Sequence, residues 1–107
     1  MIANKFILVL CTCPSQQEAD AVATALLGER LAACVNQLPG IRSLYRWKGR
    51  ITRDDEVLLL IKTSADLFAS LEKMIKTLHP YTVPEIIAVP VIAGSAEYLG
   101  WIEESIK

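Results

Sequence analysis

The chain has 107 residues, of which 52% are hydrophobic and 21% are charged, a composition typical of one folded domain and not of a disordered segment. Its formal net charge of −1 gives no general attraction to nucleic acid or an anionic membrane, and no apolar run approaches the length of a membrane span. The three cysteines are an odd number, and the first apolar run is too short for a secretory leader. Both observations favour reduced thiols. We therefore expect a single domain over residues 1–107, located in the cytoplasm.

The first predicted elements are a strand and a helix. Residues 5–13 predict a strand covered on both faces, because apolar side chains occupy both alternation phases. After Pro14, Ser15 and Glu18 have the spacing of a capping box, and apolar residues then recur at helical spacing. This pattern predicts an amphipathic helix over residues 15–31.

Two long strands follow, at residues 33–47 and 50–63, and they fold back on each other around Trp47-Lys48-Gly49-Arg50. Gly49 supplies the positive φ of a short hairpin loop with a bulge, and Pro39-Gly40 interrupts the first arm. Each arm of about 14 residues would reach about 45 Å, whereas a compact chain of this length has a body about 30–35 Å across. The outer part of the hairpin should therefore lie on another copy of the chain.

The second half of the chain predicts a helix, a strand and a terminal helix. Residues 65–78 carry an apolar stripe with Ser64 as a cap, and His79-Pro80 ends this helix because the residue before proline leaves the α region. Residues 85–92 predict the last strand, and Gly94-Ser95 begins a short terminal helix.

This βαββαβ order predicts an α+β, ferredoxin-like fold with an extra C-terminal helix and a long hairpin between the second and third strands. The strands form an antiparallel sheet in spatial order 4-1-3-2, with both main helices on one face. Proline lacks a ladder donor and belongs on edge strands. Pro39 and Pro90 fall in the second and fourth strands, which are the edges of that order.

The face of the sheet opposite the helices is predicted to be apolar, because residues 57–61 and 86–89 are continuous hydrophobic runs. Each exposed aliphatic side chain forfeits about 1.5–3 kcal/mol, so several would rival the ~5–15 kcal/mol that holds a domain together. The sequence therefore predicts a homo-oligomer. We expect Tyr45, Trp47 and Trp101 to lie at contacts between copies.

Chemistry-bearing side chains converge on one rim of the predicted sheet. Cys11 and Cys13 lie on one face of the first strand, at the end of the sheet where Glu85 begins the last strand. The second helix brings His79 to the same end. Thiolate and imidazole are ligands for copper or zinc, and soft thiolates favour Cu(I). The alternatives are that the cysteines fill space, that His79 only ends a helix and that Glu85 pairs with a neighbouring subunit.

The residues also raise two other classes of function. Cations that alternate with aromatic rings near the hairpin tip are typical of single-strand binding: Arg42, Tyr45, Arg46, Trp47, Lys48, Arg50 and Arg53. Acidic residues 54–56 offset that charge, so we interpret this segment as a polar tip and expect no nucleic-acid partner. If the protein were an enzyme, Cys11 and His79 could act as a thiolate–imidazolium pair. No third group is evident to orient His79, so we expect no catalysis.

Four motifs in this order resemble those of the CutA divalent-cation-tolerance family. They are LCT at 10–12, LAACV at 31–35, SLYRWKG at 43–49 and HPYTVPE at 79–85. The resemblance implies a ferredoxin-like homotrimer with interlocked hairpins, similar in architecture to the PII signal-transduction proteins. It also implies a role in tolerance of copper and other divalent cations, with Cys11 and His79 at the implicated positions and Glu85 as a further candidate. Leu78 stands where some members carry a second histidine.

We therefore expect a cytoplasmic, non-enzymatic homotrimer that binds copper or another divalent cation through Cys11, His79 and Glu85, with no nucleic-acid or membrane partner. The alternative is a PII-like trimeric regulatory scaffold that binds a small molecule or a partner protein in clefts between subunits.

Overall fold

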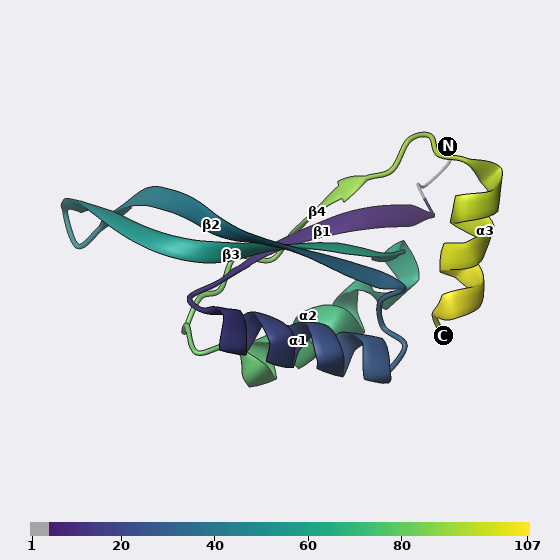
Figure 1. Cartoon of the computed structure of the whole chain (residues 1–107), viewed down its shortest axis with the longest axis horizontal. Helices are drawn as coiled ribbons and strands as arrows, with labels where there is room; N and C mark the ends of the chain where they lie inside the picture. The colour runs from purple at the N-terminus through teal and green to yellow at the C-terminus, as the bar shows by residue number, and fades with distance from the viewer. Residues whose placement is uncertain (1–4) are drawn as a thin grey trace.

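A computed structural model describes residues 5–107 of the chain. The elements in chain order are β1 (Phe6–Cys13), α1 (Gln16–Gly28), β2 (Cys34–Trp47), β3 (Arg50–Ser64), a 3₁₀ turn (Ala65–Leu67), α2 (Phe68–Leu78), β4 (Ile87–Pro90) and α3 (Ala96–Ser105). Figure 1 shows α1 and α2 on one side of the sheet, the β2–β3 hairpin projecting beyond the body, and α3 at the opposite end. Among residues 5–107, no helix is long and apolar enough to cross a membrane.

The sheet has the order β2-β3-β1-β4, which is the predicted order read from the other edge. β1 is central and antiparallel to both neighbours, with Cys11 opposite Leu59 of β3 and Val9 opposite Ala88 of β4. Pro39 and Pro90 lie in the two edge strands, β2 and β4, so neither removes a hydrogen bond from the centre of the sheet. The predicted fold class is confirmed.

The long hairpin is confirmed, but the prediction of a bulge at its loop is wrong. Trp47 pairs directly with Arg50, so the connection is the dipeptide Lys48-Gly49, with φ of 50° and 77°. Two successive positive φ values are those of a type I′ turn, whose twist matches the strands without an extra residue. The irregularity lies instead at Pro39-Gly40, where the register shifts. The hairpin contributes to a longest dimension of 44 Å, against 30 and 23 Å in the other directions.

Several element boundaries differ from the prediction. Ser15 is confirmed as the N-cap of α1, since its hydroxyl accepts from the Glu18 N–H at 3.4 Å; the Glu18 carboxylate accepts from this hydroxyl instead of completing the capping box at the Ser15 backbone. The helix ends at Gly28 instead of residue 31. Arg30 then adopts a φ of 56°, which ends the helical path. Residues 65–67 form a 3₁₀ turn before α2, and Ser64 makes no side-chain capping bond there. β4 covers only Ile87–Pro90 of the predicted 85–92, the length over which it pairs with β1.

The core lies between the sheet and the two main helices. Fully buried side chains from both layers meet there: Val9, Leu59, Ile61, Val22, Leu26, Leu71 and Ile75. The opposite face of the sheet carries half-buried or exposed aliphatic side chains: Leu8, Leu10, Leu58, Leu60, Ile87 and Val89. The prediction of an apolar face that the two main helices leave open is therefore confirmed.

Candidate metal centre

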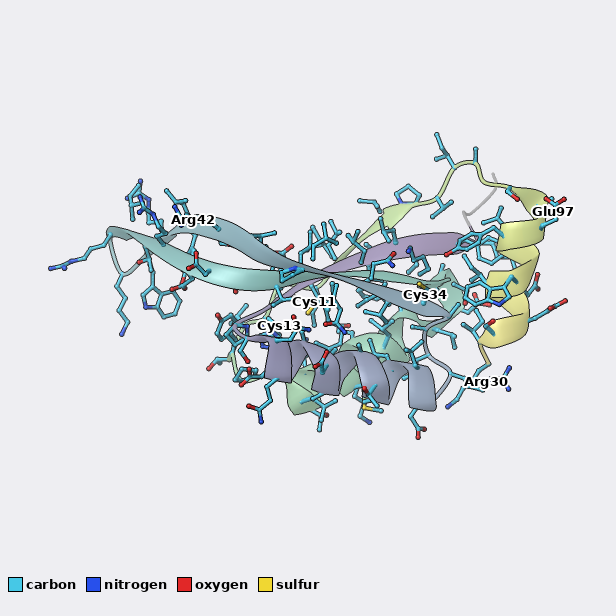
Figure 2. The ribbon with its side chains drawn as sticks, viewed as in Figure 1. Cys11, Cys13, Arg30, Cys34, Arg42 and Glu97 are labelled. Atoms are coloured by element: carbon cyan, nitrogen blue, oxygen red, sulfur yellow. The ribbon has the colours of Figure 1, made fainter. Side chains whose placement is uncertain are left out.

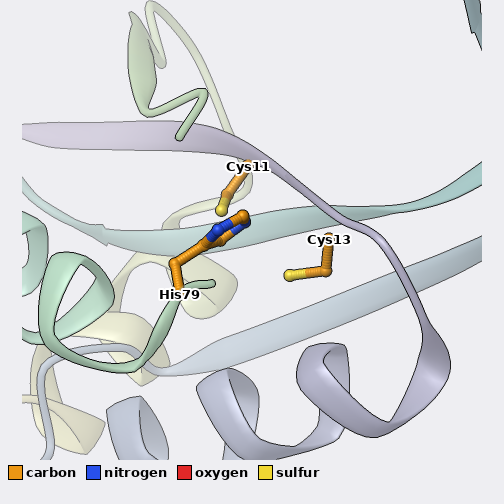
Figure 3. A group of neighbouring side chains, drawn as sticks. All are labelled: Cys11, Cys13 and His79. Carbon is orange, nitrogen blue, oxygen red and sulfur yellow. The ribbon is translucent and has the colours of Figure 1, made fainter. Parts of the chain in front are cut away.

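The end of β1 and the end of α2 bring two thiols and an imidazole together in the interior. Cys11 and Cys13 point to the helix-covered face of β1, and both are completely buried. His79 follows α2 in an extended conformation, because Pro80 excludes it from the helix, and its ring turns back toward β1. One donor atom from each of the three residues lies within 4.8 Å of the other two (Figure 3).

Both ring nitrogens of His79 already have hydrogen-bond partners. Nδ1 accepts from the backbone N–H of Tyr81 at 3.1 Å, so the proton of the neutral ring is on Nε2, which donates to the carbonyl oxygen of Thr12 at 2.7 Å. The ring also lies 4.8 Å from the Tyr81 ring, centroid to centroid. His79 therefore fastens the loop after α2 to the end of β1.

The two buried thiols differ in acidity because each acts on its neighbour. The Cys11 thiol donates to the Thr12 carbonyl oxygen at 3.9 Å. The neighbouring Cys13 thiol, and after it burial, raises the pKa of Cys11, whereas the neighbouring Cys11 thiol lowers the pKa of Cys13. Cys13 is therefore the more acidic thiol of the pair.

Cys34, the third cysteine, lies apart from this pair. Figure 2 shows Cys34 at the start of β2, toward α3, whereas Cys11 and Cys13 lie nearer the hairpin end of the body. Its sulfur is 3.8 Å from the Lys62 ammonium, and its side chain is half-buried. It offers a matched control for experiments on the buried pair.

Glu85, a predicted ligand, has a different environment. It is exposed in the loop before β4 and lines a groove of about 800 Å³ at the base of the hairpin, together with Thr12, Glu56 and Tyr81. Thr12 alternates with Cys11 and Cys13 along β1, so its side chain leaves the opposite face of the strand. Glu85 is thus on the groove side. The third member of the donor group is Cys13, which the sequence placed at this rim with Cys11 but which was not among the three expected ligands.

The residues expected at contacts between copies are accessible in the single chain. Tyr45 is 40% exposed and Trp47 is 60% exposed on β2, and Trp101 on α3 is 45% exposed. The Tyr45 hydroxyl donates to the Asp54 carboxylate across the hairpin. All three aromatic side chains keep apolar surface that a second molecule can cover.

The buried donor group fits a soft metal ion in its chemistry. Sulfur and imidazole nitrogen suit Cu(I) or Zn²⁺, and ligands at about 2.0–2.3 Å from a shared ion lie closer together than 4.8 Å, so small side-chain rotations are needed. His79 must give up one of its two hydrogen bonds to become a ligand. The three residues fit such an ion once that bond is exchanged.

The fold and this donor group define a small ferredoxin-like α+β protein with a candidate site for a soft metal ion. Residues 7–105 match the family described as CutA1 divalent ion tolerance protein. The chain belongs to this family, as its four motifs predicted.

Individual relatives agree with this assignment. The divalent-cation tolerance protein CutA of Thermus thermophilus is 52% identical over 98 residues, which cover 92% of this chain and 95% of the relative. Protein CutA of Mus musculus is 46% identical over 93 residues, and the match spans 52% of that longer protein. A solved structure of the divalent cation tolerance protein from Thermus thermophilus matches with a TM-score of 0.93 at 50% identity, over 95% of this chain and 99% of that chain. The family is named for tolerance of divalent ions and not for a reaction.

Proposed function

We propose that the protein binds a soft metal ion, Cu(I) or a divalent cation, through Cys11, Cys13 and His79, and that this binding serves metal tolerance without catalysis. The observation that carries the proposal is the convergence of three buried soft donors within 4.8 Å in a chain whose family is named for divalent ion tolerance. The cytoplasm is the compartment that suits this function, because it keeps the thiols reduced.

The energetic balance favours metal over the hydrogen bonds that metal would replace. Releasing one hydrogen bond of His79 costs on the order of 1–3 kcal/mol, whereas thiolate and imidazole sites of zinc-finger peptides bind their ion with about 10–16 kcal/mol. The thiols must lose protons to serve as ligands, and Cys13 is the more acidic of the two. All three donors are buried, so entry of the ion requires local opening of the loop after α2.

Competition for Cu(I) against a chromophoric chelator, under reducing conditions, tests the assignment. Cys11→Ala and Cys13→Ala should each lose most of the affinity, and Cys34→Ala, which removes the half-buried thiol outside the group, should retain it. Equal stoichiometry and affinity in all three variants and the wild type would remove the site. His79→Gln keeps a polar side chain at the loop and separates loss of a ligand from loss of folding.

We also propose that the chain assembles as a homotrimer. The aliphatic face that α1 and α2 leave open and the exposed Trp47 on the projecting hairpin support self-association. The number three follows from the resemblance to the CutA family. Light scattering should give a mass of three times 11.8 kDa, and a stable single-chain particle in dilute buffer would contradict the assembly.

A further inference from the structure

The loop between α2 and β4 is attached to the body of the protein by few hydrogen bonds. Pro80 and Pro84 have no backbone N–H to donate. Within the described part of the chain, residues 80–85 take part in two hydrogen bonds, and Tyr81 makes both. Its backbone N–H donates to Nδ1 of His79 at 3.1 Å, and its hydroxyl donates to the Glu56 carboxylate at 3.1 Å. Tyr81 is therefore the residue whose hydrogen bonds hold this loop in place.

The backbone bond of Tyr81 depends on which nitrogen of the His79 ring carries the proton. The ring extends from the end of α2 toward Cys11 and Cys13 (Figure 3). A neutral imidazole has one N–H donor and one acceptor nitrogen. Nε2 is the donor here, because it lies 2.7 Å from the Thr12 carbonyl oxygen, and Nδ1 is left as the acceptor for Tyr81.

Ligation of a metal ion by either ring nitrogen removes this acceptor. If Nδ1 is the ligand, its lone pair points to the ion and no longer accepts from Tyr81. If Nε2 is the ligand, the one proton of the neutral ring moves to Nδ1, and two N–H groups then face each other. The Thr12 carbonyl keeps its partner in the first case alone, but the Tyr81 N–H loses its acceptor in both.

We propose that residues 80–85 form a metal-responsive switch, in which ligation by His79 releases the Tyr81 backbone N–H and changes the path of the loop into β4. This inference rests on the proposed function, because it requires His79 to be a ligand. A buried donor without a partner is costly, so the released N–H turns to water or to another acceptor. The Tyr81 hydroxyl stays on Glu56, since that contact does not involve the His79 ring. The filled and empty states of the interior site thus differ in the loop outside it.

Nuclear magnetic resonance of the assembled, isotope-labelled protein tests the proposal, because Cu(I) has a closed d shell and does not broaden the signals. Without metal, the His79 ring should carry its proton on Nε2, and the Tyr81 N–H should be protected from hydrogen exchange. One equivalent of Cu(I) per chain should lower that protection by about tenfold, the effect of one lost hydrogen bond. The backbone N–H of His79, which donates to the Ile75 carbonyl oxygen at 2.8 Å, should keep its protection and is the internal control.

Two variants separate this switch from other effects of copper. Cys34→Ala, which lacks the thiol outside the donor group, should show the same loss of Tyr81 protection as the wild type. Cys13→Ala, which lacks a ligand, should show no loss on addition of Cu(I). Cys13→Ser keeps the size of the side chain and takes its place if the alanine variant does not fold.

The possible failures are distinguishable. Cu(I) binding that depends on Cys13 but leaves Tyr81 protection unchanged would overturn the switch and leave the proposed function standing. A metal-free His79 ring with its proton on Nδ1 would overturn the switch alone, because the acceptor would not exist. Loss of protection in Cys13→Ala as well would assign the effect to copper bound elsewhere. Absence of any Cu(I) binding that depends on Cys13 would overturn the proposed function and the switch together.

Discussion

The buried donor group and the hairpin groove lie on opposite faces of the same strand end, yet they offer opposite chemistry. Cys11 and Cys13 point into the core with His79, where the donors are soft and closed off from solvent. Thr12, between them in sequence, points to a groove that is open, aromatic and acidic. The loop after α2 repeats the division, because His79 turns inward while Tyr81 reaches Glu56 in the groove. Strand alternation and one short loop are sufficient to keep a thiol site and a carboxylate site apart.

The largest expected effect is a loss of Cu(I) affinity. Comparing a thiol variant with a carboxylate variant tests whether the carboxylates of the groove contribute to metal binding. Cys11→Ala should lower Cu(I) affinity by about 100-fold or more, because loss of a ligand exceeds the 10–100-fold effect of outer partners. Glu85→Gln should leave the affinity unchanged, since Glu85 lies on the groove side. Both values come from the same chelator competition. An equal loss in the two variants would show that one site spans both faces.

The next effect concerns the closed region alone. His79→Ala should lower the free energy of unfolding by about 2–4 kcal/mol, because it removes two buried hydrogen bonds and leaves a cavity. Urea denaturation at fixed protein concentration measures the change, since assembly makes stability depend on concentration. Thr77→Ala is the control, because its exposed hydroxyl only returns to the Lys73 carbonyl within α2. A loss no larger than that of the control would mean that His79 does not fasten the loop.

The two regions also differ in how far the sequence predicted them. The meeting of Cys11 and His79 follows from sheet order and helix direction, which periodicity and the proline positions specify. The direction of Glu85 does not, because residues 79–86 form an irregular loop whose side chains have no period. The pairing of both His79 nitrogens was missed for the same reason, since it depends on the path of that loop.

The groove was missed although its residues were noticed. Glu56 was counted with Asp54 and Asp55 as charge that offsets the arginines of the hairpin. Its carboxylate accepts a hydrogen bond from Tyr81, which is 25 positions away in the loop after α2, so its environment includes a contact that is distant in the sequence. The sequence did contain a signal. Successive side chains of a strand point to opposite faces, so Asp54 and Glu56 share one face of β3 and Asp55 lies on the other.

A smaller effect tests whether the two regions are energetically separable across the shared loop. Tyr81→Phe should lower the free energy of unfolding by about 1 kcal/mol, because it removes the hydrogen bond to Glu56 and keeps the ring. Cu(I) affinity should not change, since the backbone N–H of Tyr81 still binds His79. Urea denaturation and chelator competition on the same preparation give both values. A parallel loss of Cu(I) affinity would mean that the loop couples the sites.

The smallest expected effect is a shift in the alkaline titration of the groove. Tyr81 has a pKa of about 12 instead of its ordinary 10, because burial and the negative charge of Glu56 oppose a phenolate. The unfolded chain releases this proton at the ordinary pKa, so the stability contributed by neutral Tyr81 is present below pH 10 and is lost as the pH rises toward 12. Absorbance at the phenolate band, recorded for the wild type and Tyr81→Phe, isolates the residue. The difference should appear near pH 12; a difference centred on the ordinary pKa would show that solvent screens the groove and that neither burial nor Glu56 opposes the phenolate.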